Sequence, residues 1–191
     1  MNRHAVQLIS RGAITKIGNM LYDYGNSVWL ASMGTIGKTV LGIYQISELV
    51  TGILVNPFGG VISDRFSRRK ILMTTDLVCG LLCLAISFIR NDRWMIAALI
   101  VANIVQAIAF GFSRPANKAI ITEVVEKEEI VTYNAHLELV LQVVSVSSPV
   151  FSFLVLQFAS LHATLLLDAL TFFIAFVLVV FLPKEEAKFQ E

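Results

Sequence analysis

Charged residues and the residue types of reactive sites are scarce in this sequence. Only 15% of its 191 residues are charged, and 15 basic side chains nearly balance 14 acidic ones. Nucleic acid is therefore not an expected partner, because no basic excess is available to displace counterions from phosphates. Three histidines and two cysteines are present, in no spacing typical of a metal site, so we expect neither a metal nor another cofactor.

The few histidines also accompany no hydrolase motif. The sequence contains no Gly-x-Ser-x-Gly elbow, no His-Glu-x-x-His pair and no glycine run suited to cradling phosphates. An enzyme is therefore not expected. Cys79 and Cys83 lie one helical turn apart in an apolar run, and we interpret them as small core or lipid-buried residues.

Apolar residues are what the sequence has in abundance. They make up 56% of the chain, and the mean hydropathy is +0.73. Soluble domains contain about 45 to 50% apolar and about 25% charged residues. The composition therefore predicts an all-α integral membrane protein, since a bilayer offers an exposed backbone no hydrogen-bond partner.

Six segments are long and apolar enough to cross a bilayer as helices, which requires about 20 residues each. They are predicted at Ile14–Met33, Val40–Ile62, Ile71–Ile89, Trp94–Phe112, Val140–Phe158 and Leu161–Leu182. Between them we predict a turn from Gly34 to Lys38, a basic hinge from Asp64 to Lys70, a short joint from Arg90 to Arg93, and a polar stretch from Arg114 to Tyr133. The expected organisation is one bundle over residues 1–191, with a cytoplasmic N-terminus at 1–13, helices within 14–182, and a cytoplasmic tail or linker at 183–191.

The basic residues indicate how these spans are oriented. With the N-terminus inside, all but three of the 15 basic residues fall on the cytoplasmic side. The exceptions are Lys38, Arg90 and Arg93. Trp29 and Trp94 fall near the outer interface, where amphipathic rings prefer to lie. Both patterns predict a multi-pass protein of the cell membrane with cytoplasmic N- and C-termini.

Five polar residues lie well inside the predicted spans. Each carboxylate among them would cost about 2.5 to 3.5 kcal/mol at the bilayer centre, which disfavours contact with lipid. We expect the set to line a substrate or ion pathway; the alternative is that its members serve as interhelical hydrogen-bonding groups. The five are Asp23, Glu48, Asn103, Gln106 and Asp168.

Prolines and small residues indicate where helices bend or approach closely. Pro57 and Pro149 interrupt the hydrogen-bond ladder of the second and fifth spans and are predicted to mark bends. A ridge of Gly52, Asn56 and Gly60, at four-residue spacing, is typical of a close helix–helix approach.

The loop between the second and third spans reads Gly60-Val-Ile-Ser-Asp64-Arg65-Phe-Ser67-Arg68-Arg69-Lys70. It resembles the signature loop of the major facilitator superfamily: a glycine, three residues, Asp-Arg, one residue, a glycine and a basic run. Ser67 stands where the second glycine is usual. The stretches Arg114-Pro115-Ala116, Tyr133-Asn134-Ala135 and Leu167-Asp168-Ala169-Leu170 are similar to passages of the superfamily's macrolide and multidrug exporter branch.

The resemblance implies half of a twelve-helix transporter, built of two inverted three-helix repeats. It also implies that the loop closes the cytoplasmic side of the cavity, as a gating motif made of Gly60, Asp64, Arg65, Arg68, Arg69 and Lys70. We expect Asp76 and Glu138, near the cytoplasmic helix ends, to pair with this basic loop.

The expected function is therefore secondary transport, in which small amphipathic, drug-like compounds are exported by alternating access. A second six-helix half or a homodimer is an implied partner, together with the lipid bilayer and a proton or other coupling ion. Exporters of this family often carry an arginine at the position of Asn103, so the residues themselves support proton coupling weakly. The alternative is a membrane remnant or scaffold that does not transport by itself.

Overall fold

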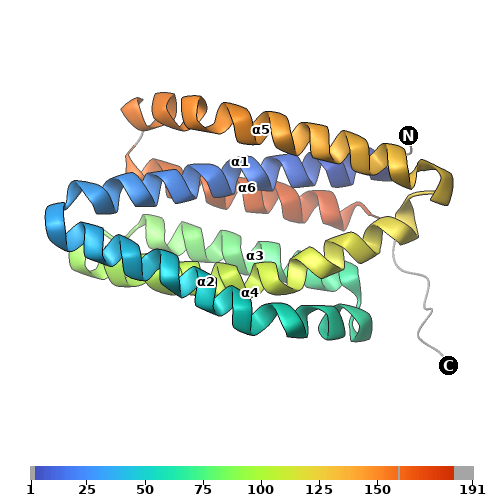
Figure 1. The fold of residues 1–191 in the computed structure, drawn as a ribbon, viewed down its shortest axis with the longest axis horizontal. Helices are drawn as coiled ribbons and strands as arrows, with labels where there is room; N and C mark the ends of the chain where they lie inside the picture. The colour runs from blue at the N-terminus through green and yellow to red at the C-terminus, as the bar shows by residue number, and fades with distance from the viewer. Residues whose placement is uncertain (1–2, 159, 183–191) are drawn as a thin grey trace.

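The computed structural model describes residues 3–158 and 160–182. Within them the chain forms six long α-helices and one short 3-10 helix, η1, and the long helices pack side by side as a bundle (Figure 1). The bounds are α1 Arg3–Ser32, α2 Gly34–Arg65, α3 Arg68–Ser87, α4 Asp92–Val124, η1 Lys127–Glu129, α5 Ile130–Phe158 and α6 Leu161–Val180.

Four of these helices are long and apolar enough to cross a membrane by length and composition, namely α2, α3, α4 and α6. Among the residues described, α1 and α5 do not meet that criterion. Arg11, Lys16 and Asp23 lower the hydropathy of α1. Four of the six predicted spans therefore meet the length and hydropathy criterion for crossing a membrane. The crossing of α1 and α5 stays a prediction.

Two helices extend well beyond the predicted apolar segments. α1 begins at Arg3, and Ala5, Leu8 and Ile9 of its first turns are buried. α4 continues to Val124, so the polar stretch predicted from Arg114 to Tyr133 is wrong as a loop. The physical reason is amphipathicity: Ala116 and the two isoleucines that follow it at helical spacing are buried, while Lys118 between them is exposed.

The turn predicted from Gly34 to Lys38 is also wrong, because α2 begins at Gly34 and only Met33 separates it from α1. Gly34 has a φ of 74°, in the left-handed region that costs glycine little. Such a residue lets the chain reverse between two helices without a longer loop.

α1 lies at the centre of the helix packing. It packs against α6, α5 and α2 and touches α4, while α3 packs against α4 and α6, and α2 against α4. α5 lies along one edge of the bundle against α1, and α2 along the opposite side beside α4 (Figure 1). Many large apolar side chains on α2 and α5 are exposed. The interior holds two clusters, one around Tyr22, Tyr44 and Phe172, and one around Leu8, Leu72 and Val179.

Candidate functional site: a polar interior and a charged groove

The five predicted cavity residues separate into two environments. Asn103, Gln106 and Asp168 are buried in the bundle, with relative exposures of 3%, 3% and 0%. Asp23 and Glu48 are exposed on α1 and α2. The structure therefore brings three of them into the interior and leaves the two acidic residues of the first two helices at a surface of the chain.

Asp168 of α6 lies in a small polar cluster that reaches α3 and α4. The Cys83 thiol donates to Asp168 Oδ2 at 3.3 Å, and the Gln106 amide donates to the same oxygen at 3.5 Å and to Cys83 Sγ at 3.1 Å. Asp168 Oδ1 has no hydrogen-bond partner in the described chain. It lies against Gly18 of α1, where an added Cβ would be 2.7 Å away. The cluster thus joins four helices through one carboxyl group.

Cys83 is a member of this cluster that the sequence interpretation missed. The apolar run around Cys83 predicts a small apolar side chain there, whereas the structure gives the thiol two hydrogen bonds. Its spacing held the only available signal: Cys79 and Cys83 lie one turn apart on a helix, so both face the same neighbours, and both are buried.

A second polar cluster centres on Tyr44 of α2. Asn26 of α1 donates to the Tyr44 hydroxyl at 3.2 Å, and Asn103 of α4 donates to the Tyr44 backbone carbonyl at 2.7 Å and to Ser47 Oγ at 3.5 Å. The exposed Asp23 carboxyl lies near enough to Tyr44 and to Glu48 for electrostatic interaction with both. Polar contacts therefore lead from the exposed acidic residues into the interior.

A groove of about 380 Å³ runs between α2 and α4. It has an acid, Glu48, and a base, Arg114, among its lining residues. The Arg114 guanidinium lies 5.8 Å from the centre of the Phe110 ring, in a cation–π contact, and that ring stacks on Phe172 at 6.4 Å. The complete lining is Gln45, Glu48, Leu49, Gly52, Ile53, Asn56, Ala107, Phe110, Gly111 and Arg114.

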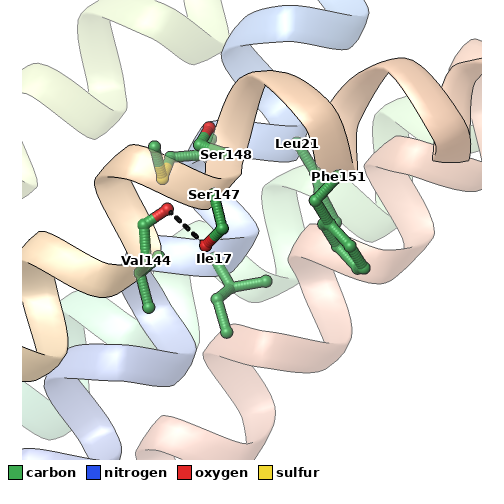
Figure 2. A pocket seen from close by; sticks show the side chains of 7 residues that line it. Ile17, Leu21, Val144, Ser147, Ser148 and Phe151 are labelled. Atoms are coloured by element: carbon green, nitrogen blue, oxygen red, sulfur yellow. Dashed lines mark hydrogen bonds between the residues drawn. The ribbon is translucent and has the colours of Figure 1, made fainter.

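A smaller apolar cavity, of about 170 Å³, lies between α1 and α5. Figure 2 shows Ile17 and Leu21 from α1 opposite Val144, Ser148 and Phe151 from α5. Ser147 donates to backbone carbonyls of its own helix, one of them Val144 at 3.3 Å. The buried Ser148 hydroxyl has no hydrogen-bond partner among the residues described, so one polar group remains available in an apolar wall.

The signature loop is very short in the structure. α2 ends at Arg65 and α3 begins at Arg68, and Ser67 caps α3 by accepting from the Lys70 backbone N–H at 3.5 Å. The φ of Ser67 is −55°, an ordinary value, so this turn does not need the glycine that the superfamily pattern usually has there. Asp64 and Arg65 are exposed, as is Lys70.

Two arginines of the loop attach α3 to its neighbours. Arg68 forms an ion pair with Glu123 near the end of α4. Arg69 donates to the backbone carbonyls of Val179, at 3.2 Å, and of Val180. These carbonyls belong to the last turn of α6, and the Val179 carbonyl also accepts from the Leu182 backbone N–H at 3.1 Å.

The glycines of the predicted ridge, Gly52 and Gly60, do not make the close helix–helix contact that was predicted there. Gly60 has open space where a Cβ would be, and Gly52 meets only the side chain of Asn56. Gly59 instead lies so close to the backbone carbonyl of Gly111 on α4 that a Cβ would overlap it. The close approach of α2 to α4 therefore uses the glycine beside the predicted ridge. Pro57 and Pro149 lie inside α2 and α5, and their bends stay predictions.

The pairing predicted for Asp76 is wrong. Its carboxylate binds Arg11 of α1, with Nη2 at 2.7 and 2.9 Å and Nε at 3.1 Å, and both side chains are buried. Arg11 also donates to Asn117 of α4 at 3.2 Å. Arg11 was assigned to a tail outside the first span, whereas α1 carries it into the bundle. Glu138, expected to pair with the same loop, is exposed on α5.

No group of three or more potential metal-binding side chains lies together in the described part of the chain. The arrangement instead combines long apolar helices with polar side chains buried between them. Polar groups turned into the bundle are typical of multi-pass membrane proteins with a solute pathway. By fold and interior, this is a multi-pass helical membrane protein.

Residues 12–191 match the family described as Major Facilitator Superfamily, and the chain belongs to this family. A stretch of 113 residues is 28% identical to the Arabinose-proton symporter of Bacillus subtilis (strain 168). That match covers 56% of this chain and 24% of the symporter. The matched stretch therefore corresponds to less than two thirds of that relative.

Proposed function

We propose that this chain is the N-terminal half of a secondary active transporter of the cell membrane, which moves small amphipathic compounds by alternating access. The observation that carries the proposal is a line of polar groups: the exposed Asp23 and Glu48 lie near enough to Tyr44 to interact with it electrostatically, and the buried Asn103 donates to the Tyr44 backbone carbonyl. In a membrane helix each such group is costly unless it faces water, solute or a partner group.

The helix contacts support an arrangement in two three-helix repeats. Exchanging α1 with α4, α2 with α5 and α3 with α6 converts the α2–α4 contact into α5–α1 and the α3–α4 contact into α6–α1, and all four contacts are present. The same exchange relates the α2–α4 groove to the α1–α5 cavity. A second six-helix half, or a second copy of this chain, would cover the exposed apolar faces of α2 and α5.

In this proposal the loop Asp64 to Lys70 gates the cytoplasmic side, and both chain ends are cytoplasmic. Arg68 and Arg69 hold the ends of α4 and α6. Asp64 and Arg65, exposed at the end of α2, are left to contact the second half. We infer that these two charges make contacts that differ between the conformations of the assembled transporter.

The cargo and direction have two candidates. The similarity to macrolide and multidrug exporters favours export of drug-like compounds. The relative named as an arabinose-proton symporter favours proton-coupled sugar transport. A membrane remnant or scaffold without transport of its own is the remaining alternative.

Transport assays in liposomes test these candidates directly. The full chain, alone and combined with a candidate six-helix partner, is reconstituted and given a pH gradient, and uptake of radiolabelled arabinose and of a lipophilic cationic dye is followed. We expect saturable dye transport only in the assembled form. Transport of arabinose but not of dye would replace the export proposal, and transport of neither by any assembly would leave the scaffold alternative.

A variant with a matched control addresses the pathway. Asn103→Leu removes the amide that joins α4 to Tyr44, and we expect loss of transport with retained folding. Asn134→Leu, at an exposed position of α5, serves as the control. Equal activity of both variants would contradict a role for the polar line.

A further inference from the structure

The α2–α4 groove carries an acidic residue, Glu48, and a basic residue, Arg114, at different positions along its length. α2 and α4 run in the same direction (Figure 1), and the Tyr44–Asn103 bond sets their register. Glu48 lies four residues beyond Tyr44, and Arg114 lies eleven beyond Asn103. At about 1.5 Å per residue, this difference separates the backbones of Glu48 and Arg114 by roughly 10 Å along the bundle.

A second contact gives a similar separation. Gly111 lies against Val55; Glu48 precedes Val55 by seven residues and Arg114 follows Gly111 by three. This register places the backbones of Glu48 and Arg114 about 15 Å apart along the bundle. In the described chain, no direct ion pair joins Glu48 to Arg114.

Neither charge is neutralised by an ion pair within the described chain. The ion pairs of that part join Arg11 to Asp76 and Arg68 to Glu123. The guanidinium of Arg114 instead lies over the Phe110 ring. Glu48 is close enough to Asp23 for their like charges to interact. One end of the groove is therefore acidic and the other is cationic.

The wall between these ends is mixed. Leu49, Ile53, Ala107 and Phe110 supply apolar surface along it, while Gln45 and Asn56 add amides. The volume of about 380 Å³ falls within the range of about 300 to 1,000 Å³ that is typical of small-molecule sites. A ligand that matches this wall needs an apolar middle and charged ends of opposite sign.

We propose that the α2–α4 groove binds an elongated small zwitterion, whose ammonium group faces Glu48 and whose carboxylate binds Arg114. This inference rests on the proposed function and specifies the cargo class of the same site. Two opposite charges on the wall of a groove are matched by complementary charges on a ligand, and a planar guanidinium matches a carboxylate in a bidentate manner. A ligand with one charge leaves one end of the groove uncompensated.

Direct binding to the purified full chain in detergent tests the proposal. The probes are ω-amino acids from 4-aminobutanoate to 12-aminododecanoate, each compared with the alkylamine and the alkylcarboxylate of equal length, by isothermal titration calorimetry. We expect one amino acid length to bind about tenfold or more tightly than either singly charged analogue, the difference that one charge-assisted hydrogen bond makes. Equal affinity of the three ligand types at every length would overturn the proposal.

Variants assign the two ends. Glu48→Gln should remove the advantage of the zwitterion over the carboxylate, and Arg114→Gln its advantage over the amine. Glu128→Gln and Lys118→Gln make the same charge changes at exposed positions outside the groove and should bind as the unaltered chain does. Equal losses in these controls would refute the assignment, and the comparison of ligands on the unaltered chain decides the question if a variant does not fold.

The binding result is separable from transport. Zwitterion binding without transport in liposomes would support this site and contradict the proposed function. Transport by the assembled protein without any preference for zwitterions would keep the proposed function and reject this ligand class.

Discussion

Replacing Asp76 by asparagine should destabilise the bundle far more than replacing any surface acid. The Asp76 carboxylate accepts three contacts from the Arg11 guanidinium, at 2.7, 2.9 and 3.1 Å. The side chains of Arg11 and Asp76 are only 8% and 4% exposed. The asparagine keeps the shape and one acceptor, but it leaves a buried guanidinium whose remaining described partner is the Asn117 amide.

Breaking a buried pair by removing one partner costs about 3 to 5 kcal/mol. Because the new amide still accepts one hydrogen bond, we expect Asp76→Asn to lower the free energy of unfolding by about 3 kcal/mol. Glu123→Gln is the matched control: it breaks the pair with Arg68, whose side chains are 22% and 30% exposed. Such a pair contributes less than about 1 kcal/mol.

The assay is unfolding of the purified chain in mixed micelles, titrated with a denaturing detergent and followed by circular dichroism. The double variant Arg11→Met with Asp76→Leu should recover much of the loss, because it removes both desolvated charges. The reasoning from burial is refuted if the free energy of unfolding of Asp76→Asn lies within about 1 kcal/mol of that of the unaltered chain. It is also refuted if the double variant loses as much stability as Arg11→Met and Asp76→Leu lose singly, added together.

Three further predictions concern packing, capping and topology. Gly59→Ala should destabilise the chain by about 1 to 3 kcal/mol, because its Cβ would overlap the carbonyl of Gly111, while Gly60→Ala, with open space around it, should be neutral or slightly stabilising; equal thermal stability of the two variants would contradict the close approach. Ser67→Ala should cost about 1 kcal/mol and Ser67→Gly a few tenths, measured by the same detergent titration, and a larger loss for glycine would show that the hydroxyl is not the cap. In a background without native cysteines, single cysteines at Ser67 and Asn91 should react with an impermeant maleimide from opposite sides of the membrane, and labelling of both from outside would reject the orientation.

The helices could be predicted from hydropathy, but their ends could not. Apolar runs stop where one face of a helix turns polar, so the first turns of α1 and the segment from Arg114 to Val124 were assigned to loops although each buries a stripe of side chains. A window average cannot distinguish an amphipathic helix from a polar loop. The helix boundaries therefore required the packing.

The placement of the polar residues could likewise be predicted only in part. The spacing of Asn103 and Gln106 placed them on one face of α4, and both are buried there. The sequence could not place Arg11 beside Asp76, because that contact depends on the register of α1 against α3 across 65 residues. Nor could it separate exposed Glu48 from buried Asp168, since both stand in equally apolar surroundings along the chain.

Arg69 contacts the last carbonyls of α6, which are synthesised much later than Arg69 itself. In the orientation proposed here, Arg69 serves first as one of the positive charges that retain the loop on the cytoplasmic side, before α6 has been synthesised. Any cation would serve at that stage. Once α6 enters the membrane, the same guanidinium reaches two carbonyls at once, which a single ammonium on a flexible stem matches poorly. One side chain thus acts first in membrane insertion and later in completing the bundle, and only the later role distinguishes arginine from lysine.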